Sequence, residues 1–168
     1  MNNHDYRVNL VDDYLKKLNL SNEIKEYYYG RNILVTGGAG AIGSNLVTAL
    51  SKLVGDDGMI IVLDNLSAIK GDEPIDFPPL PNMMFVNGDV RNDIDLKRVF
   101  REKPTIVYHL AAFFANQNSV DYPEISADVD IHGMIKLLDL AQFTGVDKFV
   151  YASSGCAIYG SYGAMPLK

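Results

Sequence analysis

Cysteine is nearly absent from this chain, since Cys156 is the only one among 168 residues. A single cysteine excludes an internal disulfide framework, and no set of cysteines and histidines has the spacing of zinc ligands, so no metal site is expected. Basic residues are also outnumbered, because 15 lysines and arginines face 21 acidic residues, for a formal net charge of −6. Without a basic stripe to neutralise phosphates, nucleic acid is not expected as a partner.

Long apolar runs are missing as well. No stretch approaches the length that crosses a bilayer, and the N-terminus lacks the basic-then-apolar order of a signal peptide. We therefore expect a cytoplasmic protein with no membrane partner. The remaining composition, with 48% hydrophobic and 21% charged residues, is that of a globular domain long enough to bury one core.

The most informative segment places three glycines, Gly37, Gly40 and Gly43, in the spacing G-x-x-G-x-x-G. A short apolar run precedes them at residues 32–35, and a helix-spaced apolar pattern follows from Leu46. Here the first glycine allows a sharp turn, the second allows a pyrophosphate to approach the backbone, and the third allows close helix packing. The alternative is an ordinary corner between a strand and a helix.

The residues around this loop extend the pattern toward a dinucleotide site. The free N–H groups at the start of the following helix, where Ala41 and Ile42 stand, would point at the pyrophosphate. About twenty residues on, a second apolar run, residues 59–63, ends at Asp64. A carboxylate there can accept hydrogen bonds from both ribose hydroxyls of the adenosine half and would repel a 2′-phosphate. The combination predicts binding of NAD in preference to NADP.

Alternating strands and helices from Asn32 onward indicate a parallel sheet covered on both faces, which is the doubly wound α/β class. The prolines between Ser67 and Asn82 mark a surface loop. The expected strands lie near 32–36, 59–63, 83–87, 105–109 and 147–152, and the expected helices near 42–54, 92–102 and 123–145.

Residues 1–30 precede this alternation and are expected to form a helical appendage. Val8, Val11, Leu15 and Leu18 have helical spacing, and Ser21 could cap a second short helix. We expect the appendage to dock on the domain's surface; the alternative is a contact with another subunit or partner, such as a homodimer.

Five short motifs follow one another along the sequence. They are Thr36 to Gly43, Asp64-Asn65-Leu66-Ser67, Gly88-Asp89-Val90-Arg91, His109-Leu110-Ala111-Ala112, and Tyr151-Ala152-Ser153-Ser154. Together these motifs resemble those of the extended short-chain dehydrogenase family of nucleotide-sugar epimerases and dehydratases. The resemblance implies a Rossmann fold over residues 31–168, incomplete here, with its last strands and a substrate domain expected beyond Lys168.

The resemblance also implies where NAD would be held. Asp89 and Val90 would bind the adenine, although Asp89 could instead cap the helix that begins near Asn92. Small residues after the fourth strand would let the backbone pass close to the ribose and nicotinamide, or could reflect tight packing only. His109 and His132 are each expected to be structural. The remaining implied cofactor contacts are Asn65, Ser67, Leu110, Ala111, Ala112 and Asp130, the last standing where the family usually has Asn.

Catalysis is implied at Ser154, which would hydrogen-bond the sugar hydroxyl that is oxidised. The family's base is a tyrosine followed four residues later by lysine, and no tyrosine of this sequence has lysine at that offset. We expect that pair beyond Lys168, so that the chain would be inactive alone. Phe113, Asn116 and Ser119 are candidates for contact with a nucleotide-sugar substrate.

The reaction type is narrowed by the residues after Ser154. Dehydratases of the family carry an Asp-Glu pair there, whereas this chain has Gly155 and Cys156, which favours 4-epimerisation through a transient 4-keto sugar. A second possibility is a GDP-mannose 3,5-epimerase-like or dehydratase reaction in which the thiol of Cys156 exchanges protons. That thiol could equally fill space at a strand end. A module that binds NAD without turnover is the third alternative.

Overall fold

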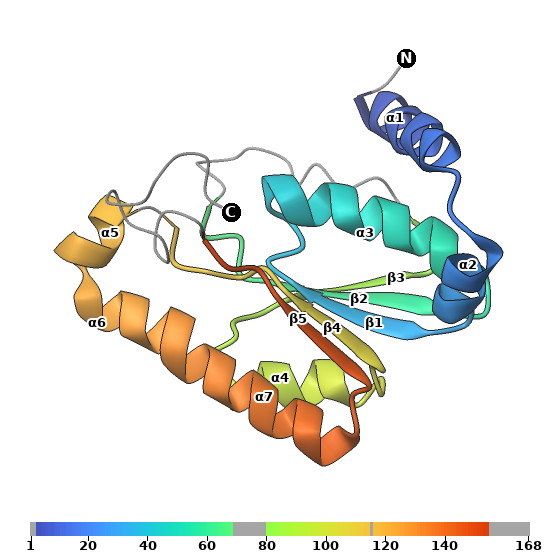
Figure 1. Ribbon diagram of the computed structural model, residues 1–168. Coiled ribbons are helices and arrows are strands. Elements are labelled where there is room, and N and C mark those ends of the chain that lie inside the picture. The colour runs from blue at the N-terminus through green and yellow to red at the C-terminus, as the bar shows by residue number, and fades with distance from the viewer. Residues whose placement is uncertain (1–2, 69–79, 115, 155–168) are drawn as a thin grey trace, which may run out of the picture.

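Five parallel strands form a single sheet with helices on both faces in the computed structural model, which describes residues 3–68, 80–114 and 116–154 (Figure 1). This is the predicted doubly wound α/β class. The strands are β1 (Asn32–Thr36), β2 (Met59–Asp64), β3 (Met83–Asn87), β4 (Ile106–His109) and β5 (Lys148–Tyr151). The helices are α1 (Asn3–Leu18), α2 (Asn22–Tyr28), α3 (Ala41–Val54), α4 (Asp93–Phe100), α5 (Asn116–Asp121), α6 (Pro123–Ser126), the π-helix η1 (Ala127–His132) and α7 (Gly133–Thr144).

The strand order β3-β2-β1-β4-β5 places β1 at the centre. The chain leaves β1 toward β2 and β3, then returns to the other side of β1 as β4, so the order reverses between β1 and β4. Ligands of such sheets bind outside the carboxyl ends of the strands at this reversal. The topology therefore places a candidate site at the ends of β1 and β4.

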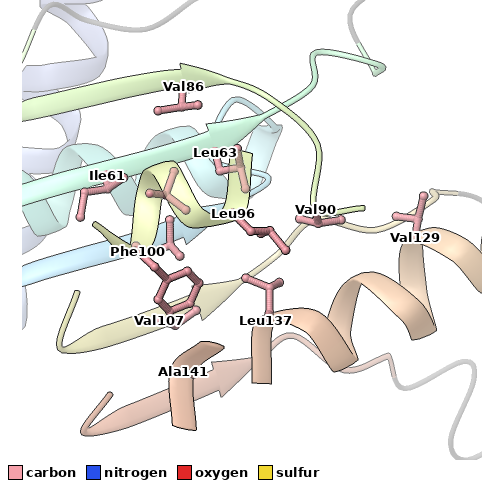
Figure 2. Close-up of a cluster of buried hydrophobic side chains, with 12 residues drawn as sticks. Ile61, Leu63, Val86, Val90, Leu96, Phe100, Val107, Val129, Leu137 and Ala141 are labelled. Carbon is pink, nitrogen blue, oxygen red and sulfur yellow. The ribbon is translucent and has the colours of Figure 1, made fainter. Parts of the chain in front are cut away.

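Two buried clusters fill the two sides of the sheet, because successive side chains of a strand point to opposite faces. Ile33 and Val35 of β1 pack with the apolar side of α3, whereas Leu34 points to the side covered by α4 and α7. Figure 2 shows the second cluster, in which Leu96 of α4 and Leu137 of α7 lie beneath the sheet. The helical apolar spacing of α3 that was visible in the sequence accounts for the first cluster.

The N-terminal helices lie against the α3 side of the domain (Figure 1). Val11 of α1 is buried there, and Lys52 of α3 pairs with Asp12 of α1 at 2.6 Å. The hydroxyls of Tyr28 of α2 and Tyr108 of β4 are hydrogen-bonded at 2.7 Å. The predicted cap is present too, because the Ser21 hydroxyl accepts a hydrogen bond from the N–H of Ile24.

The predicted helix over 123–145 is divided in three, since the chain turns through α6, the wider turns of η1 and then α7. The short helix α5 was not expected, because its six residues have no apolar repeat that would distinguish them from a loop. Among the described residues, no helix combines the length and apolar character needed to span a bilayer.

Candidate functional site

A cavity of about 560 Å³ opens at the carboxyl ends of the strands, where the order of the sheet reverses. The segments that follow all five strands contribute to it, the last through Ala152 after β5. Its lining includes the predicted residues Gly37, Gly40, Ala41, Ile42, Gly43, Asp64, Asn65, Ser67, Val90, Leu110, Ala111, Ala112 and Phe113. The structure thus brings together most of the residues that the sequence marked as cofactor contacts.

Two of the three motif glycines, Gly37 and Gly43, leave no room for a side chain. Gly37 has φ of +69°, and a Cβ there would lie 2.6 Å from the backbone nitrogen of Ala111 in the loop after β4. A Cβ on Gly43 would overlap the backbone of Gly37 and Gly38. The first glycine therefore makes the turn, and the third lets α3 begin directly against the loop.

The first turn of α3 faces the cavity. Ala41, Ile42 and Gly43 all line it, and the N–H groups of a first helical turn have no acceptor within the helix. These groups and the helix dipole favour an anion at this place. Ile42 is 74% exposed, so the same turn also offers an apolar side chain to a ligand.

The carboxylate of Asp64 joins two of the loops. One oxygen accepts a hydrogen bond from the Ala39 N–H of the glycine loop at 2.9 Å, and the other accepts from the Leu66 N–H at 2.8 Å. Each oxygen has a further lone pair, so the group can still accept hydrogen bonds from a ligand. Asp64 therefore lines the cavity and also holds the glycine loop in place.

The carboxylate of Asp89 is engaged by protein donors. Arg91 donates to it through its backbone N–H, Nε and Nη2, and Asn65 donates through Nδ2, at 2.7 to 2.9 Å. These hydrogen bonds, Arg91 foremost, lower the pKa of Asp89 to about 2. Asp89 does not cap α4, because Asn92 does so with its side-chain oxygen. The next two residues, Val90 and Arg91, line the cavity, whereas Asp89 is not among the described lining residues.

His109, the last residue of β4, helps to hold the loop that follows this strand. Its Nδ1 lies 2.6 Å from the hydroxyl oxygen of Thr36, and both side chains are buried. Burial lowers the pKa of His109 to about 4, so the ring is neutral at physiological pH. The Ala111 N–H reaches the same Thr36 oxygen at 3.4 Å. His109 and Thr36 thus hold the wall formed by Leu110 and Ala111.

Asp130 lies in η1, and its carboxylate turns toward the protein. It accepts hydrogen bonds from the Phe113 N–H at 2.8 Å and from the Ser126 hydroxyl at 2.9 Å. Asp130 is not among the described residues that line the cavity, whereas Phe113 is. Its contact with the cavity is therefore made through the backbone of Phe113.

The predicted catalytic and substrate residues are less closely gathered. Ser154 is exposed just beyond β5, close in sequence to Ala152, which lines the cavity. Cys156 lies outside the described residues. Asn116 and Ser119 are on α5; the side chain of Asn116 is outside the described part of the structure, and Ser119 is not among the described lining residues.

Among the lining residues that the sequence analysis did not predict as contacts are Arg91, Ile125 and Val129. Arg91 was part of a quoted motif but had no assigned role. Ile125 and Val129 are four residues apart on the run through α6 and η1, a spacing that places them on one helical face. Within the described residues, no group of His, Cys, Asp and Glu has the arrangement of a metal site.

The chain matches known proteins over the same region that builds the cavity. Residues 33–168 match the sequence profile of the NAD dependent epimerase/dehydratase family. The chain belongs to this family. A curated member, the UDP-glucose 4-epimerase of Mycolicibacterium smegmatis, is 37% identical over 134 residues, which are 79% of this chain and 42% of that protein.

Solved structures of the family show the same fold. An epimerase from Methanothermobacter thermautotrophicus superposes with a TM-score of 0.79 at 46% identity, covering 87% of this chain and 42% of that one. The UDP-glucose 4-epimerase of Thermus thermophilus, solved in complex with NAD, has a TM-score of 0.66 at 36% identity, covering 80% and 41%. The chain therefore spans about two fifths of the length of these family members.

Proposed function

We propose that this chain binds NAD in the cavity and forms the cofactor-binding part of a nucleotide-sugar 4-epimerase. The observation that carries the proposal is the position of Asp64, whose carboxylate bonds the glycine loop at Ala39 and faces the cavity beside the first turn of α3. An anion site and a ribose site then lie next to each other, as a dinucleotide requires. Relatives in the family are named UDP-glucose 4-epimerases, and one was solved with NAD.

The residues present fit this cofactor. The N–H groups of Ala41 and Ile42 would hold the pyrophosphate, and Asp64 would accept hydrogen bonds from the adenosine ribose. Asn65 and Ser67 border this ribose position, and Val90 offers an apolar contact to the adenine. The opposite end of the cavity, from Leu110 through Ala111 and Ala112 to Phe113, would take the nicotinamide riboside.

The adenine contact of Asp89 is proposed in a modified form. Since Arg91 and Asn65 already donate to both of its carboxylate oxygens, its first effect is to hold the turn that presents Val90 and Arg91. A hydrogen bond from the adenine amino group to Asp89 would require one of these donors to move.

The proposed reaction is epimerisation at C4 of the sugar. NAD, when bound, supplies a hydride acceptor that can return the hydride to the same substrate. Ser154 would hydrogen-bond the sugar hydroxyl, and the sugar would lie toward Phe113 and the start of α5. A carboxylate pair for dehydration is absent after Ser154, where the sequence has Gly155 and Cys156. This favours 4-epimerisation over dehydration.

We propose further that residues 31–168 form the NAD-binding domain and residues 1–30 an appendage on it. The appendage is attached by Val11 against α3 and by the hydrogen bond between Tyr28 and Tyr108. A homodimer contact through this appendage would use the groove between α1 and α3, which is lined by Leu10 and Tyr14, both half-exposed or more.

Calorimetric titration tests the cofactor assignment directly. The 168-residue chain should bind NAD with a stoichiometry of about one, and the heat should disappear when Gly40 is replaced by valine. A matched control, Asp13→Asn on the exposed side of α1, should bind NAD as the unchanged chain does. A folded chain that takes up no NAD would contradict the proposal.

A further inference from the structure

One continuous helical run touches both loops that flank the cavity. The run passes through α6, η1 and α7, from Pro123 to Thr144. At one point it bonds the loop after β4, and a turn and a half further on it bonds the loop after β3. These two loops form opposite ends of the proposed dinucleotide site.

Asp130 makes the first of these contacts. Its Oδ1 accepts a hydrogen bond from the backbone N–H of Phe113, a residue of the cavity wall, at 2.8 Å. Its Oδ2 accepts from the Ser126 hydroxyl one turn earlier at 2.9 Å, which fixes the rotamer of the carboxylate. A charged acceptor strengthens the bond to the Phe113 N–H. The position of this wall is therefore tied to the helix through one side chain.

Lys136 and Gly133 make the second contact. The ammonium of Lys136 donates to the Arg91 carbonyl at 2.7 Å and pairs with Asp93 at 2.7 Å. A Cβ on Gly133 would lie 2.8 Å from Val90 Cγ2, so the helix and the turn after β3 are in close contact. Figure 2 shows Val90 beside Val129 of the helical run at the end of the buried cluster.

Asp130 itself lies within the π-helical turns of η1, and Gly133 and Lys136 follow them. The Gly133 N–H bonds the Asp128 carbonyl, five residues earlier, where an α-helix would use the fourth. The wider turn inserts one extra residue, which shifts the angular position of everything after it. Asp130 can therefore face the loop after β4 while Gly133 and Lys136 face the turn after β3.

We infer that Asp130 and Lys136 are positioning residues that hold the two ends of the dinucleotide site separately. Asp130 sets the end that takes the nicotinamide riboside, through Phe113, and Lys136 sets the end that takes the adenine, through Arg91. Neither side chain contacts the cofactor. This inference rests on the proposed binding of NAD, and it assigns one protein contact to each end of the dinucleotide site.

The test compares two ligands, NAD and ADP, because ADP lacks the nicotinamide riboside. Their dissociation constants are measured by calorimetry on the 168-residue chain and its variants. Asp130→Ala should raise the dissociation constant of NAD about tenfold, the size expected for losing a charge-assisted hydrogen bond. It should leave the dissociation constant of ADP within about twofold of that of the unchanged chain. Lys136→Met should weaken NAD and ADP alike, by about threefold.

Conservative and control variants separate positioning from general stability. Asp130→Asn keeps an oxygen acceptor for the Phe113 N–H, so it should restore NAD affinity to within about twofold. Ser126→Ala removes only the second bond of Asp130 and should weaken NAD alone, by about threefold, which keeps the test usable if Asp130→Ala does not fold. The controls are Asp139→Asn on the exposed side of α7 and Lys97→Met on α4, which should change neither constant.

The outcomes distinguish this inference from the function it rests on. If the unchanged chain binds NAD but Asp130→Ala and Ser126→Ala weaken NAD and ADP equally, or not at all, the inference is wrong and the cofactor assignment stands. Lack of rescue by Asp130→Asn would also overturn it. If the unchanged, folded chain binds neither ligand, the proposed function fails and the inference fails with it.

Discussion

Thr36 and His109 are register partners on the neighbouring strands β1 and β4, and their side chains meet at 2.6 Å in the buried interior. The Thr36 hydroxyl oxygen also accepts a hydrogen bond from the Ala111 N–H, so the hydroxyl can donate its proton to His109 Nδ1. The pair therefore joins the strand that leads into the glycine loop to the strand that leads into the opposite wall. A neutral imidazole suits this arrangement, because Nδ1 can then accept.

The first prediction concerns the pH dependence of stability. Since the pKa of His109 is lowered to about 4 from 6.5, the unfolded chain binds a proton between these values that the folded chain does not. Stability is then fully present above about pH 6.5 and is lost as pH falls toward 4, by roughly 2 kcal/mol between pH 7 and pH 5. Urea unfolding at a series of pH values measures this loss.

The matched variants for that experiment are His109→Asn and His132→Asn. Asparagine at 109 can accept from Thr36 but does not titrate, so the difference in unfolding free energy between pH 7 and pH 5 should shrink. His132 is exposed and pairs with the exposed Asp128, and its replacement should leave the difference nearly as it was. An unchanged difference in His109→Asn would show that another group is responsible.

The second prediction concerns the choice of cofactor. NAD should bind at least about tenfold more tightly than NADP, because the Asp64 carboxylate accepts from the ribose hydroxyls and repels a 2′-phosphate. Asp64→Asn removes the charge and should reduce this preference while weakening NAD, since the amide cannot accept from both Ala39 and Leu66. Calorimetry with both cofactors measures the ratio. Equal affinities in the unchanged chain would remove Asp64 from the role.

The third prediction separates two glycines of one loop. Gly40 has φ of −69° and lines the cavity, and a Cβ there would meet only the Gly37 carbonyl oxygen, at 3.3 Å. Gly40→Val should therefore abolish NAD binding with little change in thermal midpoint. Gly37→Ala should instead lower the thermal midpoint, because φ of +69° and the contact with Ala111 cost about 2 kcal/mol or more of stability. Thermal unfolding with and without NAD distinguishes the two.

The fourth prediction concerns turnover. The 168-residue chain contains no tyrosine followed four residues later by lysine, so it should bind NAD and leave nucleotide sugars unchanged. A chain that continues through such a pair should interconvert a UDP-hexose and its C4 epimer. Ser154→Ala in that longer chain should lower kcat by about a hundredfold with NAD affinity little changed. Robust activity of residues 1–168 would contradict the missing base.

The sheet was predictable from the sequence because its signals are local. Each strand is an apolar run bounded by glycine, proline or polar residues, and the predicted runs agree with the five observed strands within one residue at either end. The start of α4 was predicted near Asn92, and Asn92 is its cap. The glycine spacing and the acidic end of β2 likewise located most of the cavity.

What the sequence could not show depends on pairing between distant residues. The π-helical turns of η1 have no distinct composition, so the run over 123–145 was expected as one helix. The four hydrogen bonds that occupy Asp89 come from Arg91 and Asn65, and only the fold brings Asn65 to it. Asp130 was expected to contact the cofactor. Its hydrogen bond to the Phe113 N–H depends on the fold, which brings η1 beside the loop after β4.

The central position of β1 sets an order of events during folding. Its partner β2 begins at Met59, whereas its other partner, β4, begins only at Ile106. Pairing with β4 closes the longer loop and is the slower contact to form. An intermediate with β1, β2 and α3 in place would already present the glycine loop and Asp64, but without the wall beyond His109. Recovery of NAD binding during refolding should therefore lag behind helix formation.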